Sequence, residues 1–238
     1  MQTLTDLVMN HVRDAVNSGK MQSGELYSVY RLADELGISR SPVRDGLLRL
    51  EEAGLIEFRK NRGFQIVDTK PEDVAEIFSL RLGIEPPAAF RAAIHRTAGD
   101  LDDADALVVR MREIADARGN PDEFFQADRS LHSLILRTAK SDRGDALVSR
   151  LRDHTRILGH STAGTSRTLL DILTEHEPII EAIRAHDPEA AREAMHNHIC
   201  ITGKLLLSQA VGTSGTTPQD RDRSAQEIWT LYTAGTAT

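Results

Sequence analysis

Four side chains in the second half of the chain could together bind a metal ion. Asp128 and His132 are four residues apart, so a helix would present both on one face. His176 and His198 also fall on helical faces whose other members are apolar. Burying an aspartate and three histidines is costly unless they satisfy one another. Convergence on a divalent cation would satisfy all four, and the sequence therefore predicts a metal site.

Imidazole and carboxylate ligands suit zinc, our first choice, and also nickel, manganese or iron. A single histidine on an apolar face is more often a core residue bonded to a neighbour, so the prediction depends on the four positions together. The same ligand types occur in oxygenase iron sites, and a metal-bound water can hydrolyse esters. An enzyme is nevertheless not expected, because no clear general base accompanies the set. A purely structural metal and a metal that is itself the signal stay open.

A second set of candidate residues lies near the N-terminus and is basic. Arg40 and Arg44 come at the start of a predicted helix, on the side opposite its apolar residues, with Ser39 and Ser41 beside them. Arginine can contact O6 and N7 of guanine together, and the first residues of a recognition helix are the ones that reach base edges. We assign Arg40 and Arg44 to bases or nearby phosphates, Ser39 and Ser41 to phosphates, and Arg49 to a weaker phosphate contact.

The elements that would position these residues form a helix-turn-helix. An apolar stripe predicts a first helix from Leu4 that stops at Gly19. A second helix is capped by Ser28 and ended by Gly37, and a third follows after a four-residue turn. Residues 55–59 and 64–67 are β-rich runs around an Asn/Gly turn, which predicts a hairpin, or wing. Arg62 and Gly63 of this wing are expected to lie along phosphates or in the minor groove.

Composition is consistent with these assignments. Residues 1–70 hold 10 Lys/Arg and 10 Asp/Glu, whereas residues 71–238 hold 19 and 26 and carry the whole net charge of −7. The single cysteine excludes an internal disulfide and favours a reducing compartment. The first twenty residues are amphipathic rather than a signal peptide, and no apolar run could span a bilayer. We expect a cytoplasmic protein without membrane contact.

Helix-breaking residues and changes in composition divide the chain into three parts. We predict a winged helix-turn-helix at 1–69, an all-α domain at 70–210 and a flexible tail at 211–238, rich in Thr, Ser, Gly and Ala. Ile228, Trp229, Leu231 and Tyr232 of this tail could instead dock as a short helix. Helix breaks are expected near residues 98, 119, 140, 163 and 187, which gives about six helices in an antiparallel bundle. Pro86-Pro87 should interrupt and kink the first of them. The fold class is therefore mainly α, with three helices plus a β-hairpin wing followed by a helical bundle.

The N-terminal residues resemble a known family. The run LADELGISRSPVRDGL from Leu32 to Leu47, followed by Gly54-Leu55-Ile56 and Arg62-Gly63-Phe64, closely resembles the DNA-binding domain of GntR regulators. Three departures stand out. Asp45-Gly46 replaces the usual Glu-Ala, and Leu48 stands where a further Arg is common. Tyr30 occupies a position where some relatives carry a DNA-contacting arginine. These departures concern the preferred base sequence rather than DNA binding itself.

The second half resembles the FCD domain of the FadR-type branch of that family. The resemblance rests on Asp128-Arg129-Ser130-Leu131-His132, on Glu175-His176 and on Met195 with His198. It implies a metal held by Asp128, His132, His176 and His198, and an Arg81–Glu85 pair in which Arg81 meets an anionic effector. A structural salt bridge is an equal reading of Arg81. The resemblance further implies a homodimer that binds a double-stranded DNA operator, as a repressor controlled by a small carboxylate at the metal.

Overall fold

The computed structural model describes residues 3–17, 20–52, 54–67, 70–157, 166–212 and 217–235. The chain forms two compact units, which divide between Lys70 and Pro71. The residues from Asp153 to the end of the helix at Ile157 group with the first unit, and the part of that helix up to Arg152 groups with the second. Among the described residues, no helix combines the length and the apolar character needed to cross a membrane.

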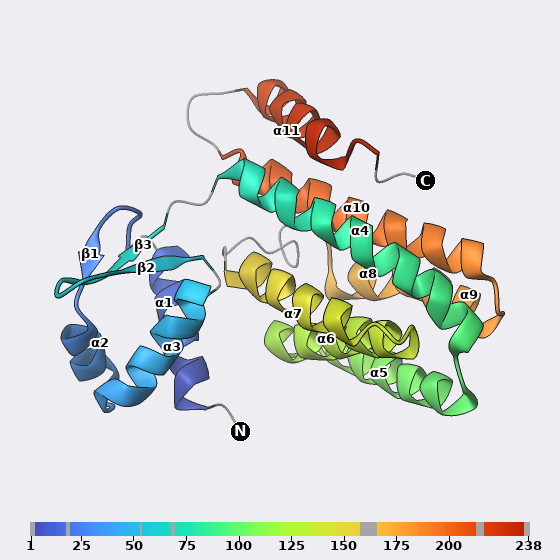
Figure 1. Ribbon diagram of the computed structural model, residues 1–238, viewed down its shortest axis with the longest axis horizontal. Helices are drawn as coiled ribbons and strands as arrows, with labels where there is room; N and C mark the ends of the chain where they lie inside the picture. The colour runs from blue at the N-terminus through green and yellow to red at the C-terminus, as the bar shows by residue number, and fades with distance from the viewer. Residues whose placement is uncertain are drawn as a thin grey trace. The chain divides into compact units, whose positions relative to one another are not determined.

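The first unit is a winged helix-turn-helix, which confirms the predicted fold (Figure 1). Its strands form one antiparallel sheet in the order β1-β3-β2. The short strand β1 was not predicted, because two residues are too few to show an alternating pattern. Gly19, where the first helix was expected to stop, lies outside the described residues. The elements are α1 (Leu4–Asn17), β1 (Leu26–Tyr27), α2 (Val29–Leu36), α3 (Arg40–Glu52), β2 (Ile56–Arg59) and β3 (Gly63–Ile66).

Local signals explain these boundaries. The Ser28 side chain accepts a hydrogen bond from the Arg31 amide and caps α2, while Gly37 ends the helix in a left-handed conformation at φ 65°. In the hairpin, Phe58 pairs with Phe64 across a turn in which Asn61 has a φ of 61°. The caps of α2 and the pairing of β2 with β3 define the ends of these elements, and the start of α3 and the tip of the wing line the same hollow.

Close packing of α1 on α3 explains the unusual Gly46. A Cβ at this position would lie 2.8 Å from Cβ of Val8 and 3.2 Å from the carbonyl oxygen of Thr5. Glycine in a helix costs about 1 kcal/mol relative to alanine. Here that cost accompanies a close approach of two helices, which a larger residue would prevent.

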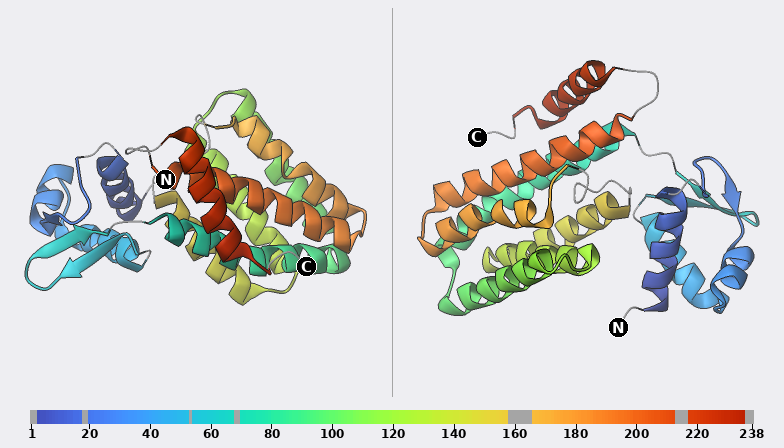
Figure 2. Two further views of the ribbon diagram at one scale, coloured as in Figure 1. Left: turned by 90° about the horizontal axis from the view of Figure 1, so that it is seen from above. Right: turned by 180° about the vertical axis from the view of Figure 1, so that it is seen from behind.

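The second unit is a bundle of helices, as predicted (Figures 1 and 2). The long helices α4 and α10 lie side by side, and α5 packs on α6. Breaks fall near the predicted positions, because Thr97, Asn120 and Asp187 each cap the helix that follows. The break predicted near residue 163 lies outside the described residues. The elements are α4 (Pro71–His95), α5 (Ala98–Asp116), α6 (Pro121–Thr138), α7 (Asp142–Ile157), α8 (Leu169–Thr174), α9 (Glu177–Arg184) and α10 (Pro188–Ala210).

Two features of this unit differ from prediction. Helix α4 continues through Pro86 and Pro87 to His95 instead of being interrupted. The predicted flexible tail is wrong for much of its length, since Pro218–Thr233 form a helix, α11, that packs on α4 and α10. Trp229 explains the docking. Its ring is 5% exposed and occupies the space that a Cβ on Gly203 would fill.

Candidate functional site

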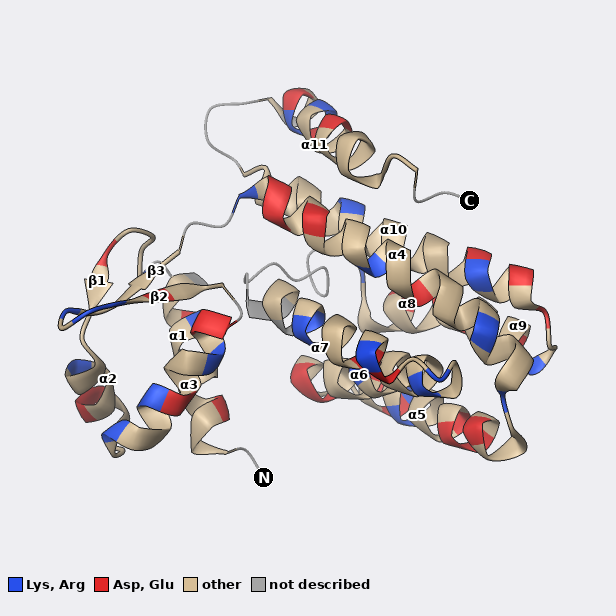
Figure 3. Ribbon diagram, in the orientation of Figure 1, with Lys and Arg blue, Asp and Glu red and all other residues tan. Residues whose placement is uncertain are grey.

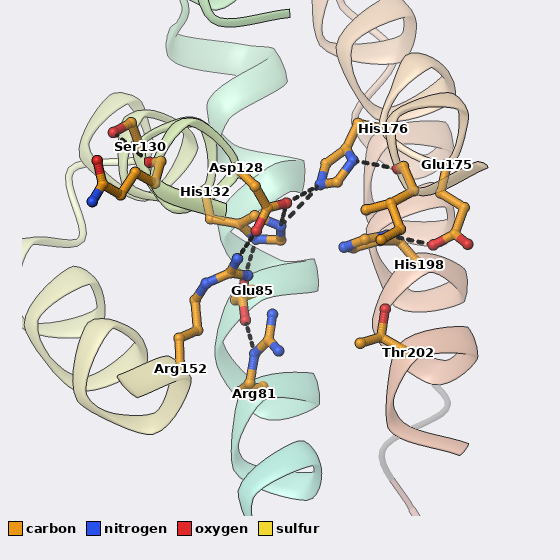
Figure 4. Close-up of polar contacts among 12 residues, drawn as sticks. Arg81, Glu85, Asp128, Ser130, His132, Arg152, Glu175, His176, His198 and Thr202 are labelled. Atoms are coloured by element: carbon orange, nitrogen blue, oxygen red, sulfur yellow. Dashed lines mark hydrogen bonds and ion pairs between the residues drawn. The ribbon is translucent and has the colours of Figure 1, made fainter. Parts of the chain in front are cut away.

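Helices α4, α6, α7 and α10 and the junction of α8 with α9 bring polar side chains to one buried point (Figure 4). Helix α6 supplies Asp128 and His132 one turn apart, and α10 supplies His198. His176 stands at the junction where α8 ends and α9 begins, as the N-cap residue of α9, two residues before Pro178. The structure thus brings all four predicted ligand residues together, and each is at most 5% exposed.

One potential ligand atom from each of the four lies within 4.8 Å of the others. Nε2 of His132 and Nε2 of His176 are 3.2 Å apart, and Oδ1 of Asp128 lies 2.9 Å from Nε2 of His176. The ring centroids of His176 and His198 are 4.2 Å apart. This spacing is compact enough for a single cation to touch every member of the group.

The second nitrogen of each ring already has a partner. Nδ1 of His176 lies 2.8 Å from the carbonyl oxygen of Ile172, and Nδ1 of His198 lies 3.0 Å from Oε2 of Glu175. Nδ1 of His132 is bonded to Oε2 of Glu85. A carbonyl and two carboxylates can only accept hydrogen bonds, so each Nδ1 carries the proton and donates it. Each Nε2 consequently offers a lone pair toward the centre of the group.

Electrostatics keep the rings of His176 and His198 neutral. Burial, reinforced by the neighbouring His132, lowers the pKa of His176 to about 3. Burial, together with His176 and His132, also holds the pKa of His198 well below its ordinary value. Burial by itself would raise the pKa of Glu85, but the Arg81 guanidinium and His132 outweigh it and keep that pKa well below normal. Neutral imidazoles beside ionised carboxylates form a set of acceptors.

Such a set of acceptors fits a divalent cation. Three imidazole nitrogens and a carboxylate oxygen repel one another when buried together without a positive charge between them. Hydrogen bonds from the far ring nitrogens to Glu85, Ile172 and Glu175 are the outer contacts that orient histidine ligands in metal sites. The donor chemistry of this group therefore matches that of a metal centre.

Three arginines surround the cluster, and each is paired with a carboxylate. Nε of Arg81 lies 2.6 Å from Oε1 of Glu85, so this predicted effector residue takes part in a buried ion pair. Sequence reasoning missed two further pairs, Arg152 with Asp128 and Arg167 with Glu175. Arg152 lies 24 residues after Asp128 on another helix, and no local pattern could have linked them. Only the neighbouring position of Glu175 and His176 hinted at the role of Glu175.

The second candidate site lies on the first unit, between α3 and the wing. Ser39, Arg40, Ser41 and Arg44 are all exposed at the start of α3, as predicted. They line a hollow of about 850 Å³ together with the beginning of α2 and the turn of the wing. The blue ribbon segments of Figure 3 mark Lys and Arg positions both on α3 and at the tip of the wing. Arg49 lies farther along the helix, 4.0 Å from Asp6, and is not among the lining residues.

The wing residues have distinct surroundings. Gly63 has a φ of 113°, and a Cβ there would lie 2.0 Å from the carbonyl oxygen of Tyr27, so only glycine allows β1 and β3 to pair. Arg62 is exposed in the turn. Arg59 instead donates from Nη1 to Glu57 at 2.8 Å and from Nε to Gln65 at 2.9 Å, so two of its five N–H donors are engaged within the wing.

Comparison with known families agrees with both halves of this description. Residues 4–66 match the model for bacterial regulatory proteins of the gntR family, and residues 76–200 match the model for the FCD domain. The solved structure of E. coli McbR/YncC superposes with a TM-score of 0.67 at 21% identity, covering 88% of this chain and 99% of that one. A putative GntR regulator from Rhodococcus sp. RHA1 gives a TM-score of 0.62 at 23% identity, covering 85% and 97%.

Relatives of similar length are regulators rather than enzymes. The chain is 26% identical to the Bacillus subtilis HTH-type transcriptional regulator YdhC, over 84% of this chain and 91% of the relative. It is 27% identical to a probable D-xylose utilization operon transcriptional repressor of Paenarthrobacter nicotinovorans, over 81% and 85%. It is 28% identical to the E. coli repressor RspR, over 68% and 71%. The chain therefore belongs to the gntR family of bacterial regulatory proteins, and is a DNA-binding transcription regulator with an FCD domain.

Proposed function

We propose that the protein is a dimeric, cytoplasmic repressor whose operator affinity is set by a small carboxylate bound at a divalent metal. The observation that carries the proposal is the convergence of unprotonated nitrogens from His132, His176 and His198 with the Asp128 carboxylate. Relatives named as repressors support the direction of regulation. Zinc is the first choice of metal, and nickel, manganese and iron also suit these ligands.

A bound metal would supply a positive centre to which an effector carboxylate can coordinate. Four protein ligands leave one or two positions on a six-coordinate ion. The chain's own contribution is to hold Nε2 of His176 and His198 unprotonated and fixed in direction, through Ile172 and Glu175. Asp128 contributes the charged ligand, and its second oxygen is held by Arg152.

Charge around the cluster indicates the class of effector. The three arginines of the described part of the site are each balanced by one carboxylate, in the pairs Arg81–Glu85, Arg152–Asp128 and Arg167–Glu175. With His176 and His198 neutral, a divalent ion then adds two positive charges beyond those that the three described carboxylates balance. Uncompensated charge in a buried site is costly. A dianion such as a dicarboxylate would restore neutrality, and Arg81 and Arg152 lie close enough to share in its recognition.

Operator contacts are assigned to the first unit. Arg40 and Arg44 are proposed to read base edges, with Ser39 and Ser41 on the phosphates beside them. Arg62 and the bare backbone of Gly63 would follow the adjacent backbone or the minor groove. Arg49 is assigned at most a peripheral phosphate, since it lies outside the hollow and close to Asp6.

An apolar stripe on α4 supports the homodimer. Leu80 is 46% exposed and Ile94 is 50% exposed, while Gly83 and Pro87 between them are also exposed. With the half-buried Phe90, the spacing of these residues alternates between three and four, as in helix seams. A second copy of the chain would cover this stripe.

The part of the stripe from Leu80 to Pro87 is complementary to itself in the antiparallel direction. Around an axis between residues 83 and 84, Leu80 of each copy faces Pro87 of the other, and Glu76 faces Arg91. Gly83 lies at the crossing, where a Cβ would meet no atom of its own chain within 4 Å. Acidic turns at the beginning of α4 are visible in Figure 3. An isologous interface requires this kind of matching.

Coupling between effector and operator would pass through the packing of the bundle. A ligand that alters this packing changes the separation of two DNA-binding units in a dimer, and half-sites are read at a fixed spacing. A coupling of about 1–3 kcal/mol, or 5- to 150-fold in operator affinity, is typical of such regulators.

The test begins with operator DNA that the full chain itself selects from random duplexes. Metal-stripped and zinc-reloaded proteins are compared by gel mobility shift, with succinate or acetate added. We expect succinate to lower operator affinity at least 5-fold in the zinc-loaded protein, and acetate to act more weakly. His176→Ala should abolish the response, whereas His196→Ala, on α10 but outside the cluster, should keep it.

Other outcomes separate the alternatives. An equal response of stripped and reloaded protein would disprove the role of the metal. A large change on adding zinc alone would favour the metal as the signal. For the dimer, Leu80→Glu should yield monomers in sedimentation, whereas Val109→Glu, 55% exposed on α5, should not. Dissociation by both or by neither would contradict the α4 interface.

A further inference from the structure

Tyr30 is an exposed aromatic residue at the rim of the DNA-facing hollow. It stands in the first turn of α2, two residues after the capping Ser28, and is 65% exposed. A side chain of this size gains little from so exposed a position in the isolated unit. It lines the same hollow as Arg40 and Arg44, between α3 and the wing.

The ring of Tyr30 lies under the guanidinium of Arg40. Cζ of Arg40 is 4.5 Å from the centroid of the ring, within the range of a cation–π contact. The described residues include no carboxylate paired with Arg40. Arg59, in contrast, has donors committed to Glu57 and Gln65. The two arginines face the same hollow but differ in what holds them.

Stacking and ion pairing leave an arginine in different states for binding. A guanidinium stacked on a ring uses one of its flat faces, and all five N–H groups remain available in its plane. A guanidinium paired with a carboxylate must first give up those hydrogen bonds. Stacking therefore restricts the motion of the side chain without occupying the donors that would read guanine O6 and N7.

We infer that Tyr30 is a positioning residue for DNA recognition, which holds Arg40 in its base-reading conformation by stacking. Arg44 has a looser version of the same arrangement, with Cζ 5.9 Å from the centroid of Phe58. The inference rests on the assignment of Arg40 to a base contact in the proposed function. It predicts that the aromatic ring of Tyr30, rather than its hydroxyl, is what matters for affinity.

The test is a double-mutant cycle on the selected operator duplex. Full-length wild type, Tyr30→Phe, Tyr30→Leu, Arg40→Gln and the double variant Tyr30→Leu/Arg40→Gln are compared by gel mobility shift. We expect Tyr30→Phe to bind like wild type and Tyr30→Leu to bind about 2- to 5-fold more weakly. In the Arg40→Gln background, Tyr30→Leu should have no further effect, because the group that it positions is gone.

Measuring operator affinity at several salt concentrations gives a second readout, which would change if Tyr30→Leu removed a contact to the DNA backbone. The slope of log affinity against log salt reports the number of phosphates contacted, and it should be the same for wild type and Tyr30→Leu. Exposed Tyr30 should tolerate these changes, and thermal melting checks that each variant is folded.

The outcomes separate this inference from the proposal beneath it. If Arg40→Gln itself leaves operator affinity unchanged, the base-contact assignment fails. If Arg40→Gln weakens binding but Tyr30→Leu does not, the positioning role is wrong. Loss of affinity in Tyr30→Phe, a changed salt slope, or an unaltered effect of Tyr30→Leu in the Arg40→Gln background would show that Tyr30 contacts DNA directly.

Discussion

The two units of the molecule treat charge in opposite ways. In the DNA-binding unit, the arginines proposed to read the operator lie exposed around an open hollow, held by aromatic rings rather than by carboxylates. In the helical domain, arginines and carboxylates form buried or half-buried matched pairs around the histidine cluster. A surface that binds a polyanion keeps the hydrogen-bond donors of its arginines available for the ligand. A buried site for a small ligand instead balances the charges of its own side chains.

The largest expected effect concerns the buried pair of Arg81 and Glu85. Glu85→Ala leaves the Arg81 guanidinium, which is 4% exposed, without its carboxylate, and should lower the free energy of unfolding by about 3–5 kcal/mol. The matched control is Glu177→Ala, which breaks an exposed pair with Arg112 and should cost under about 1 kcal/mol. Urea titrations measure both, and equal losses would erase the contrast between buried and exposed charge.

Within the first unit, arginines with and without a carboxylate partner should contribute differently to operator affinity. Arg44→Gln removes a proposed base contact and should weaken operator binding by about 1–3 kcal/mol, or roughly 10- to 100-fold. Arg59→Gln should have a smaller effect, because Glu57 already neutralises its charge and Glu57 and Gln65 engage two of its donors. The comparison uses gel mobility shift on one duplex. A larger loss from Arg59→Gln would reverse the roles of helix and wing.

Acidification should destabilise the metal-free helical domain. The pKa of His176 is lowered in the folded state to about 3, so between pH 6.5 and 3 the unfolded chain binds more protons and stability falls as the pH falls. At pH 5 the loss should reach about 2 kcal/mol per such histidine relative to pH 7. Urea titrations in the presence of a chelator measure it, and His176→Gln should show a smaller loss. A metal-free protein equally stable at both pH values would refute the neutral cluster.

The smallest expected effect tests helix packing in the first unit. Gly46→Ala gains about 1 kcal/mol of helix propensity, but its methyl group would lie 2.8 Å from Val8. Overpacking of this kind costs about 1–3 kcal/mol, so we expect a net loss of about 1 kcal/mol in thermal or urea unfolding. Gly83→Ala, on an open face of α4, should instead be stabilising in a monomeric background such as Leu80→Glu. Stabilisation by Gly46→Ala would mean that α1 can move away.

Sequence could predict what neighbouring residues determine. The cap at Ser28, the left-handed Gly37 and the hairpin turn at Asn61 are local, and each lies where the pattern indicated. The four residues of the histidine cluster could also be identified from sequence, because each lies on a helix face whose other residues are apolar, which predicts that its side chain points inward. Here local periodicity was enough to identify residues from distant helices.

What sequence could not predict depends on which helices meet. The pairs Arg152–Asp128 and Arg167–Glu175 join separate elements, and an arginine on an amphipathic helix carries no sign of its partner. Helix α11 was predicted only as an alternative, a short helix around Ile228–Tyr232, because the composition of the segment resembles that of a linker. Its docking depends on Gly203, which lies on another helix and provides the space for Trp229.

Trp229 also makes α11 observable without any label, because it is the only tryptophan in the chain. Its ring centroid is 6.4 Å from that of Phe78, and the Phe78 ring lies 5.0 Å from the Arg81 guanidinium that pairs with Glu85. The intrinsic emission of the unmodified protein therefore originates a few side chains from the histidine cluster. A spectral shift on adding zinc or succinate would report, in real time, that a change at the cluster has travelled to the C-terminal helix.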